Sequence, residues 1–125
     1  MFEQDYVMRM IHEMVRAALK FLFDIDSVSP TEELLKDEAE KENFEKLLDM
    51  ADKGLFDKAK TTLENFADRS DTDALKIGLL YYSRINEFDD DFLDKNDYSR
   101  DEIEKDIHTL LDKYNLGGLI PHTAE

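Results

Sequence analysis

Residues 72–88 read TDALKIGLLYYSRINEF, and this stretch decides the fold class of the chain. Its apolar side chains lie on more than one side of a helix, which is typical of a central helix packed on both flanks. They are Leu75, Ile77, Leu79, Leu80, Tyr81, Tyr82 and Ile85. Gly78 costs this helix about 1 kcal/mol of propensity relative to alanine. We therefore expect another helix to approach closely at Gly78.

The segments on either side also have helical periods. Ser29 precedes a proline and two acids, which predicts a helix start there, and Gly54 predicts its left-handed end. A further helix is expected over about 56–67, and Ser99 with Glu102 predicts the cap of another. No strand-like alternation occurs, and residues 89–97 (DDDFLDKND) are expected to be a polar connection. The chain is predicted to be all-α, with about five helices.

The first helix is expected over Phe2–Phe23, with a wide apolar face and a narrow polar strip. This apolar area is more than one packing face needs, and three explanations are open. The helix could cover the core of its own chain, pair with a second copy, or lie on a membrane or a partner helix. We favour a homodimer as the explanation for the excess apolar area. The possible interface residues are Val7, Met10, Ile11, Met14, Val15, Ala18, Phe21 and Leu22.

The chain has 125 residues, enough for one domain with one modest core. We divide it into the N-terminal helix and its connection (1–28), helical hairpins (29–116) and a tail (117–125). It has no cysteine, so disulfides are excluded. The N-terminus is interrupted by charges and resembles neither a secretory signal nor a membrane span. A cytoplasmic protein is expected.

The charge balance bears on partners. The chain has 31 acidic and 16 basic residues, a formal net charge of −15. Such a surface repels nucleic acid and anionic lipid, so nucleic acid is not expected as a partner and a membrane is disfavoured. Residues 1–28 have five acids and three bases, so nearly all of the negative charge lies after Val28.

No constellation of residues indicates catalysis or a cofactor. His12, His108 and His122 lie far apart in the sequence and lack the spacing of a zinc site. The aspartates of residues 89–97 lack the central glycine of a calcium loop, so we expect them to favour a turn and a helix start, and a cation there stays an open question. No carboxylate pair stands out on an apolar helix face. We expect neither an enzyme nor a bound metal or cofactor.

A second possible binding surface is a groove between the helices that precede and include 72–88. Tyr81, Tyr82 and Arg84 could line it, because arrays of helical hairpins bind extended peptides along such faces. The more conservative interpretation is that both tyrosines belong to the core.

Two resemblances accompany these patterns. The segment GLFDKA at 54–59 resembles the turn and second-helix start of a tetratricopeptide repeat, in which glycine turns the chain and an aromatic residue fills the hairpin. Asn43 and Leu47 depart from that pattern. The resemblance implies antiparallel hairpins in a right-handed superhelix.

The opening FEQDYVMRMI (2–11), followed by EMVR (13–16), is similar to that of a family of small proteins from Gram-positive bacteria, classified only as a domain of unknown function. This resemblance implies a bacterial cytoplasmic origin and no assigned activity. Together, these observations favour a non-enzymatic protein–protein interaction module that self-associates through its first helix. The alternatives are a small-ligand binder or enzyme with a scattered site, and a peripheral membrane protein.

Overall fold

The computed structural model describes residues 2–24, 35–66 and 72–114, and in these ranges every regular element is a helix. The all-α fold class is therefore confirmed, with six helices in the described ranges where about five were expected. The helices are α1 (Phe2–Phe23), α2 (Glu38–Asp52), α3 (Phe56–Phe66), α4 (Thr72–Ile85), α5 (Asp90–Lys95) and α6 (Arg100–Lys113).

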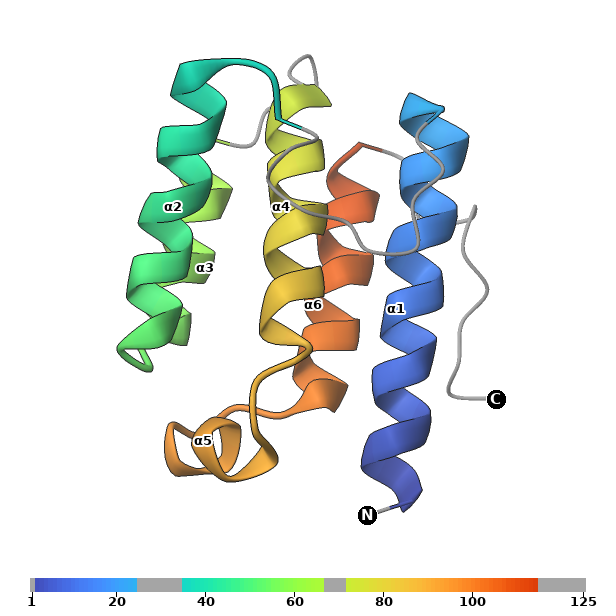
Figure 1. Cartoon of the computed structure of the whole chain (residues 1–125), viewed down its shortest axis with the longest axis vertical. Coiled ribbons are helices and arrows are strands. Elements are labelled where there is room, and N and C mark those ends of the chain that lie inside the picture. Colours follow the sequence, from blue (N-terminus) through green and yellow to red (C-terminus); the bar gives the residue numbers. More distant parts are fainter. Residues whose placement is uncertain (1, 25–34, 67–71, 115–125) are drawn as a thin grey trace.

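The long helices form two layers around α4. Figure 1 shows α2, α4 and α1 side by side, with α3 and α6 behind them. Helix α4 contacts α1, α2, α3 and α6, as expected for a helix with apolar residues on several sides. One cluster of buried side chains draws on all six helices. The tetratricopeptide-like superhelix stays a prediction.

Gly78 of α4 packs tightly against the helices of the other layer. A Cβ atom placed on it would be 2.6 Å from Cδ2 of Leu110 and 3.2 Å from Cδ2 of Leu63. These leucines belong to α6 and α3, so the expected close approach of a neighbouring helix at Gly78 is confirmed.

Helix α2 begins later than the sequence indicated. Residues 35–37 are not helical, and Asp37 is the N-cap, whose side chain accepts a hydrogen bond from the backbone N of Ala39 at 3.1 Å. The expected start at Ser29 lies outside the described residues, but a continuous helix from there to α2 is wrong. Leu35 is not helical, yet it is 1% exposed. We infer that burying this side chain stabilises the chain more than continuing the helix through residues 35–37 would.

The end of α2 agrees with the sequence. Gly54 has φ +78°, and the backbone N–H groups of Gly54 and Leu55 donate to the carbonyls of Ala51 and Met50, both at 2.9 Å. These are the two bonds of a Schellman motif. The predicted left-handed glycine is confirmed.

The segment 89–97 is not an irregular connection. Helix α4 ends at Ile85, and α5 follows over Asp90–Lys95. Phe92 and Leu93 stabilise this short helix, because Leu93 is buried and the Phe92 ring lies edge-on to that of Phe56, with centroids 6.0 Å apart. Because aspartates surround Phe92 and Leu93 in the sequence, the pattern of residues 89–97 did not indicate a helix.

Helix α6 begins as predicted. The Ser99 side chain accepts from the backbone N of Glu102 at 3.2 Å, which is one half of a capping box. Tyr114 follows the last residue of the helix. Gly117, Gly118 and the expected tail lie outside the described residues.

Candidate functional site

The apolar face of α1 belongs to the core of its own chain. Five of the eight possible interface residues are buried there: Val7, Ile11, Met14, Val15 and Ala18. Met10 and Leu22 are partly buried and pack against the same core, whereas Phe21 is 71% exposed. The first of the three explanations therefore accounts for most of this face. Any surface that α1 offers to another molecule must lie on its opposite side.

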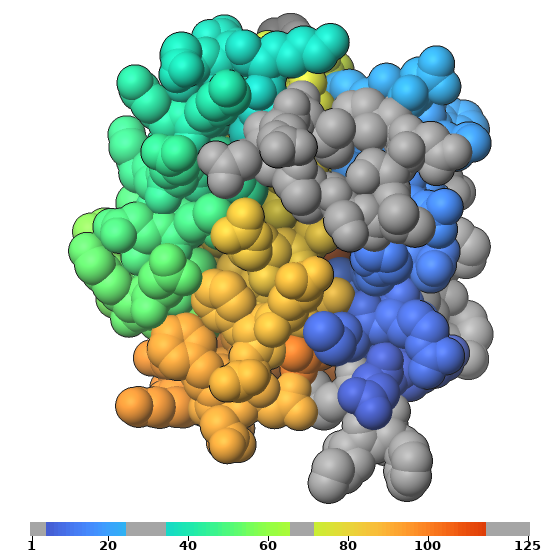
Figure 2. All heavy atoms as spheres, in the orientation of Figure 1, coloured from blue at the N-terminus to red at the C-terminus, as the bar shows by residue number. Residues whose placement is uncertain are grey.

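That opposite side is the outer strip of α1. We define the strip as the exposed residues Asp5, Tyr6, Arg9, Glu13, Ala17, Lys20 and Phe21. Tyr6 and Phe21 are 57% and 71% exposed, and in the described ranges only Leu55, at 43%, is a further exposed large hydrophobic residue. The strip has two bases and two acids, so it has no net charge. Among the described helices, α1 is the outermost on its side of the view in Figures 1 and 2.

The structure separates the three possible groove residues. Tyr81 and Tyr82 are 1% and 2% exposed, with ring centroids 5.1 Å apart. Arg84 is exposed, and its guanidinium lies 5.9 Å from the centroid of the Phe44 ring. The tyrosines therefore belong to the core, as the more conservative interpretation held, and do not line an open groove with Arg84.

Asp106 is a buried carboxylate that the sequence interpretation missed. It is 7% exposed. Its Oδ2 accepts a hydrogen bond from the Tyr98 hydroxyl at 2.5 Å, and its Oδ1 lies 3.0 Å from Nζ of Lys60. Our expectation concerned pairs of carboxylates, and it did not identify this single buried one. The signal was available, because Asp106 falls between Ile103, Ile107 and Leu110 at helical spacing.

The surroundings of Asp106 favour a structural role. The hydrogen bond to Asp106 raises the pKa of the Lys60 ammonium. Burial and the Asp106 charge raise the pKa of the Tyr98 hydroxyl. Both carboxylate oxygens are engaged, and the adjoining depression beside Lys105 is open, with 530 Å³ of empty space that includes solvent. The cluster joins α3 to α6. Each oxygen of the Asp106 carboxylate already has a partner within the chain, which favours a structural role over a catalytic one.

These buried hydroxyls predict cooperative alkaline unfolding. Burial is the first cause that raises the pKa of Tyr81, Tyr82 and Tyr98 above the ordinary value of 10.0. Because the folded state holds these protons more tightly, their stabilisation is complete below pH 10 and is lost as the pH rises above it. We expect tyrosinate absorbance to show the three residues ionising together with the loss of helical circular dichroism. Full ionisation of all tyrosines while the helices persist would contradict this.

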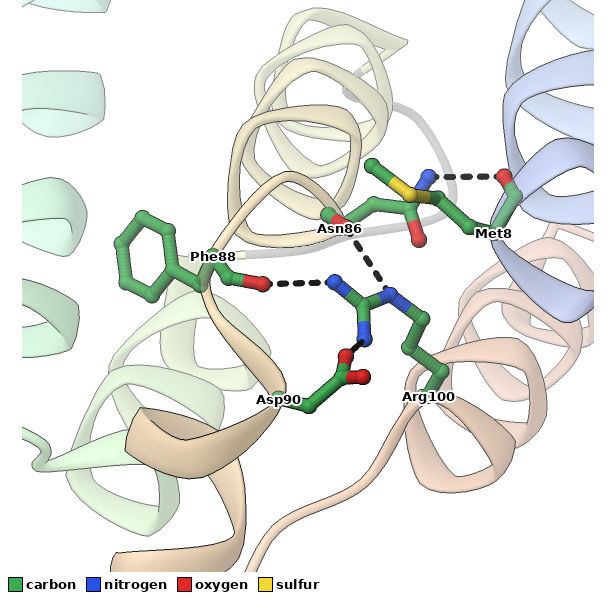
Figure 3. Close-up of polar contacts among 5 residues, drawn as sticks. All are labelled: Met8, Asn86, Phe88, Asp90 and Arg100. Carbon is green, nitrogen blue, oxygen red and sulfur yellow. Dashed lines mark hydrogen bonds and ion pairs between the residues drawn. The ribbon is translucent and has the colours of Figure 1, made fainter. Parts of the chain in front are cut away.

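A second set of buried polar groups links α1, α4, α5 and α6. Arg100 is 3% exposed. Its Nε donates to the carbonyl of Asn86 at 3.1 Å, and a terminal nitrogen donates to the carbonyl of Phe88 at 2.5 Å. It also forms an ion pair with Asp90. The side-chain amide of Asn86 donates to the carbonyl of Met8 at 2.9 Å. Figure 3 shows this Arg100 network connecting the end of α4 with α1, α5 and α6.

The described residues offer no metal site. Within residues 2–24, 35–66 and 72–114, no three of the histidine, aspartate and glutamate side chains converge as metal ligands would. His12 and His108 lie on α1 and α6, and His122 is outside these ranges. In the 89–97 segment, Asp90 is paired with Arg100. None of the helices in the described part of the chain is long and apolar enough to cross a membrane.

The fold and these sites define a class: an acidic all-helical domain in which the buried side chains of Asp106 and Arg100 link helices to one another. The chain belongs to a family of unknown function (DUF6483), whose family model matches residues 1–115. The expected membership in an uncharacterised domain family is thereby confirmed. No curated protein and no solved structure matches the chain.

Proposed function

We propose that this protein is a non-enzymatic interaction module that self-associates through the outer strip of α1. The observation that supports this proposal is the exposure of Tyr6 and Phe21, at 57% and 71%, on a helix whose apolar residues between positions 7 and 23, apart from Met8, Ala17 and Phe21, lie in the core or pack against it. Covering an exposed aromatic ring contributes about 2 kcal/mol. We also propose a cytoplasmic location, which suits a chain without cysteine.

The distribution of charge favours the same face. Two copies with a net charge of −15 each repel one another, and this repulsion is weakest where the facing surfaces are neutral. Helix α2, by contrast, has six acids and two bases among its 15 residues. A contact through the outer strip therefore opposes association less than a contact through α2.

Point substitutions test this proposal better than deletion of α1, because α1 is part of the core. We expect light scattering on the full chain to show a concentration-dependent dimer. Phe21→Glu should shift the equilibrium to the monomer by removing an apolar contact and adding negative charge. Leu55→Glu is the matched control, because Leu55 is 43% exposed on the turn between α2 and α3, and it should dimerise as the wild type does.

Two results would contradict the proposal: a wild-type chain that is monomeric at about 100 µM, or equal losses of dimer in both variants. A liposome sedimentation assay on the same proteins tests the membrane alternative. In that case the wild-type chain is a monomer that sediments with the liposomes, and Phe21→Glu abolishes this sedimentation.

A further inference from the structure

Three carboxylates come together where α2 and α4 begin. The two helices pack against each other, and in Figure 1 both start at the upper end of the molecule. Asp37 and Glu40, from the start of α2, and Asp73, from the first turn of α4, line one open depression there, with 470 Å³ of empty space that includes solvent. Like charges this close oppose the packing of the two helix ends.

Glu40 is the most enclosed of the three. It is partly buried, whereas Asp37 and Asp73 are exposed. Its Oε1 atom is shielded from solvent and has no hydrogen-bond partner among the described residues. An enclosed carboxylate oxygen without a donor destabilises the folded state most when the group is charged. The site therefore accommodates the neutral form of the Glu40 carboxyl better than the ionised form.

The contact with Asp73 has the same consequence. The side chains of Glu40 and Asp73 are hydrogen-bonded to each other. Ionised carboxylates only accept hydrogen bonds, so this bond needs a proton on one of the two groups. Burial of Glu40, the bond to Asp73 and the Asp73 charge raise the pKa of Glu40 above the ordinary 4.5, in that order of importance. The Asp37 charge adds to this rise, and the Lys76 ammonium opposes it.

The influences that favour the ionised form of Glu40 are weaker. The ammonium of Lys76 is shared with α1, because it lies 5.6 Å from the centroid of the Phe23 ring. The first turns of α2 and α4 favour negative charge through the partial charges of their free backbone N–H groups. Asp73, by contrast, has a whole charge in direct contact with Glu40. The contact between like charges therefore decides the sign of the effect.

We propose that the Glu40–Asp73 pair is a pH-sensitive contact between α2 and α4: one shared proton holds the two helix ends together, and ionisation of both carboxyls loosens them. Because the folded state binds this proton more tightly than the unfolded chain, the stabilisation is complete below pH 4.5 and is lost as the pH rises through the higher folded-state pKa of Glu40. Mild acidification should therefore tighten this end of the molecule, whether or not the chain self-associates.

Glu40→Gln tests this contact, because a glutamine amide donates to Asp73 at any pH. In urea unfolding of the full chain at pH 7, this variant should be more stable than the wild type, and its advantage should disappear below pH 4.5. Glu38→Gln is the matched control. It removes the same charge from the same first turn of α2, but at an exposed position, and it should not stabilise the chain at pH 7.

Carbon-13 NMR titration of the carboxyl groups reads the proton directly. In the wild type, Glu40 should titrate above pH 4.5, and Asp73→Asn should lower its midpoint, since an amide donates to the ionised Glu40 carboxylate. The proposal is overturned by a Glu40→Gln variant no more stable than the wild type at pH 7, by an equal gain in Glu38→Gln, or by a Glu40 titration that ignores Asp73→Asn.

Discussion

Arg100→Met is expected to lower the free energy of unfolding by about 3 kcal/mol, because it removes a buried donor from two carbonyl groups at once. Both carbonyls, those of Asn86 and Phe88, lie where the chain leaves α4. Asp90 contributes less to this loss, since its side chain is 56% exposed and regains water when the arginine is gone. The methionine retains most of the length and apolar stem of the side chain, so the loss reports mainly on the hydrogen bonds.

Urea unfolding followed by circular dichroism measures this effect. Arg84→Met is the control, because Arg84 is exposed and its contact with the Phe44 ring contributes at most about 1 kcal/mol. Arg100→Lys should lie between wild type and Arg100→Met, since one ammonium cannot reproduce the planar fork of donors. Equal stabilities of Arg100→Met and Arg84→Met would show that the Arg100 network does not hold the helix ends together.

Gly78→Val should destabilise the chain by a similar amount, about 3 kcal/mol, through overpacking. The first added carbon already lies 2.6 Å from Leu110 Cδ2 and 3.2 Å from Leu63 Cδ2. Two further methyl groups at this site leave no room without shifting α6 or α3 away from α4. Loss of this contact separates the two helical layers.

Gly78→Ala separates the steric effect from the backbone effect. It gains about 1 kcal/mol of helix propensity, and its single Cβ displaces only the flexible tips of Leu110 and Leu63, so it should be much milder than Gly78→Val. Thermal unfolding of both variants provides the comparison. A valine variant as stable as the wild type would mean that the layers are not closely packed at this position.

The fold was predictable where local sequence decides it. The many-sided apolar pattern of residues 72–88 predicted the central helix, Gly54 predicted the left-handed turn at the end of α2, and Ser99 predicted the cap of α6. The sequence failed where long-range contacts decide. Helix α5 exists because Phe92 reaches Phe56, whose ring also stacks on Tyr98 with centroids 4.7 Å apart, and Leu35 is buried outside any helix. Neither contact has a periodic signal.

The candidate site was only partly predictable for a related reason. Helical periodicity identifies which residues of α1 are apolar, but it does not tell whether they meet their own chain or another. The structure assigns most of them to the core and leaves Phe21 outside. For Asp106, helical spacing could have predicted its position among isoleucines. Its partners, Tyr98 and Lys60, could not be predicted, because only the tertiary fold brings them to Asp106.

A single thiol tests most directly whether the outer strip of α1 meets its own copy. Since the chain has no cysteine, Ala17→Cys creates one reactive group in the middle of the outer strip, and Thr61→Cys creates one on the exposed side of α3. A disulfide requires Cα atoms about 4.4–6.8 Å apart. Under mild oxidation at equal concentration, Ala17→Cys should form disulfide-linked dimers much faster than Thr61→Cys, and Phe21→Glu in the same chain should slow it to the control rate. Equal rates for the two single cysteines would contradict self-association through this strip.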